Sequence, residues 1–127
     1  AAAARKVRGV PLIETPAFAA QLAQLEIEAM ALETMVLRLL ADLASGADSG
    51  PRGSMVKLRW SDLYQRATAL WIDAHGPEAA HFRALDGEGP ADMPYAMQGA
   101  LYSRVTSIYG GSSEIQHNII ARRALGL

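Results

Sequence analysis

The residues best suited to contact a ligand are two glycines followed by two serines, Gly110 to Ser113. Glycine lets the backbone adopt left-handed conformations and approach a ligand closely. A helix that begins at these serines has unpaired backbone amides, which favour an anionic or polar group. The same residues are also typical of a tight turn between two helices with no ligand. The spacing alone leaves both interpretations open.

Other common kinds of active site have no support in the sequence. The chain has no cysteine, which excludes disulfides and thiolate metal sites. Its histidines, His75, His81 and His117, lie at no spacing that favours a metal site, so none is expected. There is also no Gly-x-Ser-x-Gly elbow, phosphate-binding loop or dinucleotide fingerprint. Hydrolase and nucleotide triphosphatase chemistry therefore lacks support.

Composition indicates one soluble globular domain over residues 1–127. Hydrophobic residues make up 50% of the chain and charged residues 20%, a balance that allows a buried core. The formal net charge is -1 and no dense block of Lys and Arg occurs, so we expect no nucleic-acid partner. No apolar run approaches the roughly 20 residues of a membrane-spanning helix, so we expect no membrane insertion. A cytoplasmic location is the default expectation.

A long helix is predicted from the apolar spacing after Thr15. Apolar residues recur at alternating steps of four and three, which is typical of a helix face that packs against other helices. They are Phe18, Leu22, Leu25, Ala29, Leu32, Val36, Leu39 and Leu43. Pro16 suits the first helical position, and the Thr15 hydroxyl is expected to cap the free amides.

A second helix is predicted over residues 56–74. The segment 45–54 before it loses the periodicity and gathers Gly, Ser and Pro, which indicates a loop between the helices. The pair Gly76-Pro77 is expected to end the second helix. A long loop should follow as far as Pro94, since apolar periodicity is weak there.

Two more helices complete the predicted fold. The third is expected over residues 97–108, and Gly110-Gly111 breaks it. Ser113 and Gln116 have the spacing of a capping box, so a fourth helix should begin there and run to about Leu125. Four amphipathic helices with no expected strand predict an all-α fold, an up-and-down four-helix bundle.

The end of the chain carries a family resemblance. Residues 107–127 are Ser-Ile-Tyr-Gly-Gly-Ser-Ser-Glu-Ile-Gln-His-Asn-Ile-Ile-Ala-Arg-Arg-Ala-Leu-Gly-Leu, and this segment closely resembles the C-terminal signature of acyl-CoA dehydrogenases. Residues 5–12 are similar to the arginine-rich, glycine-containing entry to the long helix of these enzymes. With the order of the four helices, the resemblance spans essentially the whole chain.

The resemblance implies that residues 1–127 are the C-terminal helical domain of a larger enzyme. The N-terminal helical and β-barrel domains of the family are expected to be absent from this chain, and FAD is held between the domains and across a subunit interface. A carboxylate removes the α-proton of an acyl-CoA substrate while flavin accepts a hydride from the β-carbon, giving trans-2-enoyl-CoA. The implied partners are an electron-transfer flavoprotein or similar acceptor and the other subunits of a homo- or hetero-oligomer. The 127 residues alone are expected to be inactive.

The resemblance also implies that this chain lacks the usual catalytic base. Many members place a glutamate directly after the Ile-Tyr pair, and Gly110 occupies that position here. Glycine has no proton-accepting side chain, so no catalytic residue is assigned to the chain. Either an upstream segment supplies the carboxylate, or the parent protein is a non-catalytic subunit that completes the flavin site of a partner.

Residues that match the family pattern are expected to bind cofactor and substrate. The resemblance assigns flavin contacts to Arg5, Ile108, Ser112 and Glu114, and substrate contacts to Tyr109, Gly110 and Arg122. Simpler interpretations remain open for several of them. Arg5 could be a solvated charge at the entry to the long helix, and Ser112 or Ser113 could only cap the fourth helix. Tyr109 could only pack, and Arg122 could face water.

Two inner segments point to a subgroup. Residues 32–40 and the run Lys57-Leu-Arg look more like bacterial members that act on dicarboxylic, aromatic-derived or steroid side-chain acyl-CoA substrates. The resemblance therefore implies a bacterial enzyme.

Overall fold

The computed structural model describes residues 3–80 and 93–127, and it confirms the all-α class. The main elements are α1 (Pro16–Ala44), α2 (Arg52–His75), α3 (Met93–Ser103) and α4 (Ser113–Ile120). Short 3-10 helices cover Leu12–Glu14, Pro77–Ala80 and Arg104–Ser107, and a π-helix covers Ala121–Leu125. No helix of the described ranges is long and apolar enough to cross a membrane.

A two-stranded hairpin precedes the helices, so the expectation of no strand was wrong. Strand β1 (Lys6–Val7) pairs antiparallel with β2 (Val10–Pro11). Arg8 and Gly9 between them have φ values of 52° and 85°. Two successive residues with positive φ make the tight turn that matches the twist of paired strands. The strands are too short to show the period of two that sequence patterns rely on.

The start of α1 corrects the predicted cap. Pro16 does occupy the first turn, as expected, but Thr15 makes no side-chain hydrogen bond to the helix amides. Its hydroxyl instead donates to the carbonyl oxygen of Leu12, 2.7 Å away in the preceding 3-10 turn. Thr15 therefore fastens the entry segment rather than the helix end. Phe18 follows as the one buried residue of α1.

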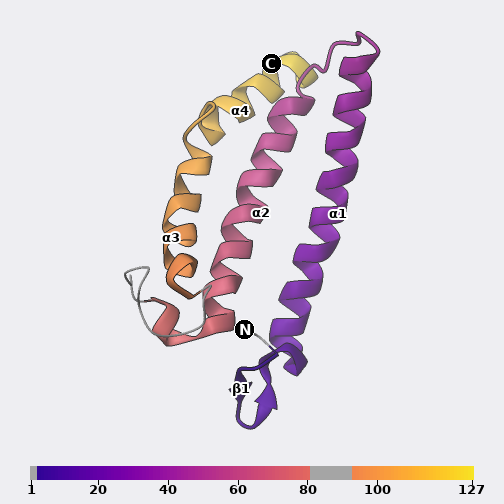
Figure 1. Cartoon of the computed structure of the whole chain (residues 1–127). Coiled ribbons are helices and arrows are strands. Elements are labelled where there is room, and N and C mark those ends of the chain that lie inside the picture. Colours follow the sequence, from indigo (N-terminus) through magenta and orange to yellow (C-terminus); the bar gives the residue numbers. More distant parts are fainter. Residues whose placement is uncertain (1–2, 81–92) are drawn as a thin grey trace.

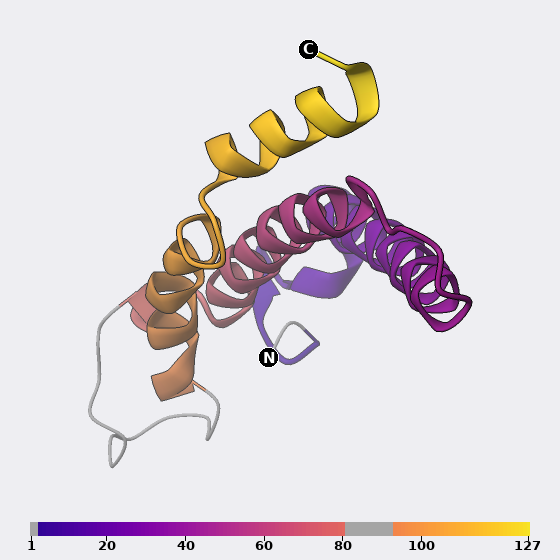
Figure 2. The same ribbon diagram turned by 90° about the horizontal axis from the view of Figure 1, so that it is seen from above.

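Helix α2 is the central element of the molecule. It contacts α1 on one side and both α3 and α4 on the other (Figure 1). Helices α1, α2 and α3 alternate in direction, and α4 then bends across the end of α2 where the α1–α2 loop lies (Figures 1 and 2). The bundle is therefore open, with α1 at one edge of the helix layer.

The third helix differs from its predicted bounds. Its α-helical part ends at Ser103, and residues Arg104–Ser107 continue as a 3-10 helix. It begins at Met93, one residue before Pro94, because proline is tolerated in the first turn of a helix. The predicted loop that reaches Pro94 lies mainly outside the described residues, as does His81.

The core is small and lies at the α1–α2 and α2–α3 contacts. Leu12, Phe18, Leu70 and Ala74 form one buried apolar cluster, near the start of α1. Between α2 and α3 the buried residues are mostly small and hydroxylic, and Ser61, Thr68, Ser103 and Thr106 are each at most 5% exposed. Ser61 donates to the Thr106 carbonyl oxygen at 3.0 Å, and Thr68 donates to the Ser103 hydroxyl at 3.2 Å. Small side chains let these helices approach closely while their hydroxyls remain hydrogen-bonded.

Candidate functional site

The double glycine forms the turn between the 3-10 helix Arg104–Ser107 and α4. Gly110 has a φ of 67° and Gly111 a φ of 91°, both in the left-handed region that favours glycine. A Cβ on Gly111 would lie 2.6 Å from Nε2 of Gln116, whereas a Cβ on Gly110 would meet nothing within 4 Å. Crowding therefore requires glycine only at position 111, and a side chain at position 110 would have open space.

Gln116 holds this turn in place. Its side chain is 7% exposed, and Nε2 donates to the carbonyl oxygens of Gly110 at 2.9 Å and Gly111 at 3.3 Å. The predicted capping box of Ser113 and Gln116 is therefore wrong, because Gln116 turns back to the glycines. The cap is Ser112, whose hydroxyl accepts from the Ile115 amide at 3.4 Å. One of the interpretations left open by the sequence was that Ser112 or Ser113 caps the fourth helix. The structure shows that Ser112 does so.

The structure brings two predicted flavin contacts, Ser112 and Glu114, together. The Ser112 hydroxyl donates to the Glu114 carboxylate, and this hydrogen bond is the main reason that the pKa of Glu114 lies below its usual value. The Glu114 backbone amide, His117 and Lys57 lower the pKa further. The carboxylate stays ionised at the exposed amino end of α4, where the helix dipole favours a negative charge.

The residues before the glycines face outward. Ile108 is 66% exposed and Tyr109 is 43% exposed, so neither packs into the core of the described structure. Gly110 is exposed beside them. The turn therefore presents an apolar surface, a hydroxyl and a helix amino end, and Gly110 contributes no carboxylate to it.

Arg5 lies far from this turn. Its guanidinium Nη1 donates to the carbonyl oxygen of Asp73 in the last turn of α2, where a cation is favoured by the helix dipole. A Cβ on Gly76 would lie 2.9 Å from the guanidinium carbon of Arg5. Lys57 lies near Glu114, whose pKa it lowers, and Asp73 binds Arg5. These two residues of α2 are about 24 Å apart along the helix, at 1.5 Å per residue. The predicted flavin contacts therefore fall at opposite ends of the molecule.

Arg122 lies in a third place, in the π-helix near the carboxyl end of the chain. It is exposed. Its neighbour Arg123 ties this segment to the α1–α2 loop, with Nη2 3.7 Å from the Asp48 carboxylate and Nη1 3.5 Å from the Gly50 carbonyl oxygen. Arg122 is thus presented on a segment that is fastened at its end, but it does not meet Tyr109 or Gly110 in the described structure.

A cavity behind the turn was missed by sequence reasoning. It has a volume of about 620 Å³ and opens between α1, α2 and α4. Its lining mixes apolar residues with Arg59, Asp62, Ser107, Ser113 and His117. Ser113 and His117 lie one helical turn apart on α4, so they share one face of that helix. That spacing was the only feature of the sequence that pointed to a polar wall here.

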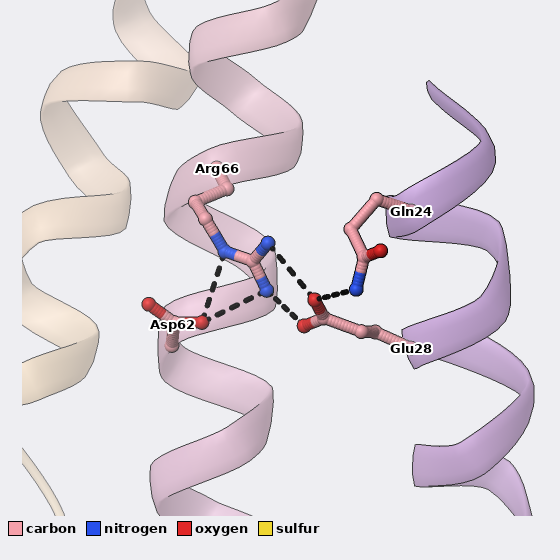
Figure 3. A network of polar contacts seen from close by, with 4 residues as sticks. All are labelled: Gln24, Glu28, Asp62 and Arg66. Carbon is pink, nitrogen blue, oxygen red and sulfur yellow. Dashed lines mark hydrogen bonds and ion pairs between the residues drawn. The ribbon is translucent and has the colours of Figure 1, made fainter. Parts of the chain in front are cut away.

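A polar network fastens α1 to α2 beside this cavity (Figure 3). Arg66 of α2 makes two hydrogen bonds to the Glu28 carboxylate of α1, one of them at 3.2 Å, and Nε donates to Asp62 at 2.9 Å. Gln24 also donates to Glu28, at 2.7 Å. The hydrogen bonds from Arg66 are the main reason that the pKa of Glu28 is lowered, and those to Glu28 raise the pKa of Arg66. The sequence gave no sign of this pairing.

The expectation of no metal site concerns His75, His81 and His117. Within residues 3–80 and 93–127, no group of three or more His, Cys, Asp and Glu side chains is close enough to hold a metal ion. His81 lies outside that part of the chain. His75 Nδ1 donates a hydrogen bond to the Trp71 carbonyl oxygen, 3.0 Å away.

The comparison with known protein families is decisive. Residues 1–125 match the family described as "Acyl-CoA dehydrogenase, C-terminal domain". The chain belongs to the acyl-CoA dehydrogenase family. Members of the family are oxidoreductases and are generally FAD-dependent.

Two curated relatives share the name acyl-CoA dehydrogenase IpdE1. The protein from Mycobacterium tuberculosis is 33% identical over 97 residues, which cover 72% of this chain and 24% of the relative. The protein from Mycolicibacterium smegmatis is 70% identical over 71 residues, which cover 56% of this chain and 17% of the relative. The chain therefore spans about a quarter or less of the length of these acyl-CoA dehydrogenases.

Proposed function

We infer that the chain is the C-terminal domain of an FAD-dependent acyl-CoA dehydrogenase that converts an acyl-CoA thioester to trans-2-enoyl-CoA. In the complete protein it contributes flavin contacts and part of an oligomer interface. The observation that carries this proposal is the outward-facing turn from Ile108 to Glu114, since it combines exposed apolar side chains with a hydroxyl at a helix amino end. Family membership supports the same assignment.

The turn fits a flavin, whose ring is flat, apolar on its faces and polar at its edges. Ile108 can cover an apolar face, and Ser112 and the free amides of α4 can meet polar edge atoms. The Ser112 hydroxyl also lowers the pKa of the neighbouring Glu114 carboxyl. FAD, when bound, supplies the hydride acceptor. Arg5 contributes at the opposite end of the domain, toward the dinucleotide of a neighbouring subunit.

The substrate contacts follow from the same turn. Tyr109 offers an aromatic wall for the acyl chain, and Gly110 leaves open space where many members carry the catalytic glutamate. Arg122 is exposed and can meet the phosphates of coenzyme A, for which a guanidinium is well suited. Because Gly110 cannot accept a proton, the carboxylate that removes the α-proton comes from outside residues 1–127.

The cellular setting is proposed from the relatives and the sequence pattern. The two curated relatives are mycobacterial, which favours a bacterial enzyme of the cytoplasm that passes its electrons to an electron-transfer flavoprotein or a similar acceptor. The substrate class is a dicarboxylic, aromatic-derived or steroid side-chain acyl-CoA, in line with residues 32–40 and 57–59.

Flavin spectroscopy on the complete protein tests this function. The complete protein that contains residues 1–127 should retain FAD and show the visible absorbance of oxidised flavin. Under anaerobic conditions, addition of an acyl-CoA should bleach that absorbance. The isolated 127 residues should produce no enoyl-CoA, because most of the flavin and thioester site lies elsewhere. A complete protein that never retains FAD, or turnover by the isolated domain, would contradict the proposal.

A second candidate is a non-catalytic subunit of a heteromeric acyl-CoA dehydrogenase. Gly110 favours it, because the turn is otherwise intact and lacks only the carboxylate. Co-purification separates the two candidates. A homo-oligomer that oxidises acyl-CoA alone refutes the partner model, whereas activity that appears only after a second polypeptide is added supports it.

A further inference from the structure

Lys57 of α2 carries an ammonium group that is enclosed in the protein without a hydrogen bond. Its Nζ atom is buried and has no hydrogen-bond partner among the residues that the structure describes. A buried charge without a partner opposes folding, because it loses its hydration and gains no contact in return. The fold alone therefore does not explain a charge at this position.

The place of Lys57 on α2 puts it behind the turn that leads into α4. It shares one face of α2 with three side chains that are at most 9% exposed, Ser54, Ser61 and Thr68. On this face Ser61 donates to the Thr106 carbonyl oxygen at 3.0 Å, and Lys57 lies one helical turn closer to the start of α2. Because α2 and α3 run in opposite directions, Lys57 is level with the segment that follows Thr106, where α4 crosses α2 (Figure 1).

Three carboxylates of α1 and α2 are already held by arginine side chains. Glu28 and Asp62 each accept hydrogen bonds from Arg66. Asp42 forms an ion pair with Arg52. These anions are therefore committed to other cations, and they do not serve as the counter-charge of the buried ammonium.

Glu114, in the first turn of α4, is a carboxylate within the electrostatic reach of Lys57. The Ser112 hydroxyl is the main cause of its lowered pKa, and the charges of His117 and Lys57 add to that effect. His117 belongs to the same helix as Glu114, so Lys57 is the cation that α2 contributes. Arg104, on the preceding 3-10 helix, bonds instead to a side chain of α2 at 3.1 Å.

Covering of the turn would make this counter-charge necessary. Glu114 is exposed in the described chain, so water can stabilise its ionised carboxylate. A flavin and further domains that cover the turn would remove that water and favour the neutral acid. An ammonium nearby has the opposite effect, because a positive charge favours the ionised carboxylate.

We propose that Lys57 is a positioning residue of the flavin site, and that its buried ammonium supplies the counter-charge for Glu114 when the turn is covered. The carboxylate then stays ionised beside the Ser112 hydroxyl, which the turn presents to the flavin. The role toward the flavin rests on the proposed function. The pairing of Lys57 with Glu114 does not, so the two are tested separately.

The affinity of the complete protein for FAD, measured between about pH 5 and about pH 8, tests the role toward the flavin. Lys57→Met removes the ammonium and keeps a side chain of similar length, and Lys57→Arg keeps the charge. Arg59→Met is the matched control, since it removes a cation of the same part of α2 that acts on Glu28. Flavin fluorescence during titration of the apoprotein gives each dissociation constant.

The ratio of the dissociation constant of Lys57→Met to that of the parent should be near unity at the upper pH and rise several-fold toward the lower pH. Without the ammonium, the carboxylate of Glu114 takes up a proton at higher pH. Lys57→Arg and Arg59→Met should follow the parent, and in a Glu114→Gln background the rise should be absent. A ratio that stays near unity, or that is raised equally at every pH as for a purely structural lysine, would overturn the proposal.

Melting temperatures of the apoprotein test the pairing without flavin. Lys57→Met, Glu114→Gln and the double variant form a double-mutant cycle at low salt, where charge pairs are least screened. Lys57→Met should raise the melting temperature more in the Glu114→Gln background than in the parent, because only the parent loses an attraction. Equal changes in both backgrounds would overturn the pairing. A complete protein that binds no FAD would contradict the proposed function, and this cycle would still decide the pairing.

Discussion

At each end of the molecule a polar side chain lies against a glycine that has a positive φ, but the two side chains have different roles. At one end Gln116 contacts Gly111, and at the other Arg5 contacts Gly76, and both glycines have positive φ. Gln116 is buried and is not itself a predicted ligand contact, so the turn that it holds stays free to face outward. Arg5 is both the fastening residue and the predicted flavin contact. The Gly110 turn is therefore held by a residue other than its proposed ligand contacts, whereas Arg5 would have to serve the fold and the proposed flavin contact together.

Glycine at position 111 should be the most sensitive point in this comparison. Gly111→Ala should lower the free energy of unfolding by about 4 kcal/mol, from backbone strain and from the displaced hydrogen bonds of Gln116. Gly110→Ala is the matched control and should cost about 1 kcal/mol, because its Cβ meets no neighbour. Urea unfolding measures both. Equal losses would show that Gln116 does not control the turn.

Substitution of Gln116 should destabilise the fold more than substitution of Arg5. Gln116→Leu should cost about 2 kcal/mol, because two carbonyl oxygens lose their donor in a buried setting. Arg5→Met should cost less than about 1 kcal/mol, because water can reach the exposed end of α2. Thermal unfolding of both variants, with Asn118→Leu as an exposed control on α4, checks the order. A larger loss of stability for Arg5→Met than for Gln116→Leu would contradict the different roles given to these two side chains.

Removal of the Glu28 carboxylate should give the smallest loss of stability, and that loss should depend on pH. Arg66 lowers the pKa of Glu28 in the folded chain, so the carboxylate stabilises the fold above its unfolded pKa of about 4.3. That contribution disappears as the pH falls through the lower folded-state pKa. Glu28→Gln should therefore be less stable than the parent at neutral pH and equally stable in acid. A difference that persists unchanged in acid would exclude this cause.

The sequence predicted the helices well where apolar periodicity is long. The heptad from Phe18 to Leu43 and the proline at position 16 correctly placed α1, and Gly76 correctly ended α2. The hairpin at Lys6 was missed because two-residue strands show no period. The cap at Thr15 was wrong because a nearby carbonyl oxygen competes for the same hydroxyl.

Prediction of the candidate site was limited by contacts between distant residues. The importance of the Gly110–Ser113 segment was visible in the sequence, because glycine pairs and serines have strong local preferences. The role of Gln116 was not, since a capping-box spacing and a turn-holding amide look alike in sequence. The separation of Arg5 from Ser112, and the pairing of Glu28 with Arg66, depend on how α2 is packed, which no local pattern encodes.

The most direct test of the central claim is the affinity of the complete protein for FAD when the Ser112 hydroxyl is removed. Ser112→Gly keeps a residue that caps helices almost as well as serine, so the fold should be nearly unchanged. Loss of one hydrogen bond should raise the FAD dissociation constant about fivefold to tenfold, measured by flavin fluorescence on apoprotein titration. Ser107→Ala, whose hydroxyl bonds to the Arg104 carbonyl oxygen, is the control and should leave the constant unchanged. An unchanged dissociation constant for Ser112→Gly would contradict the assignment of this turn to the flavin site.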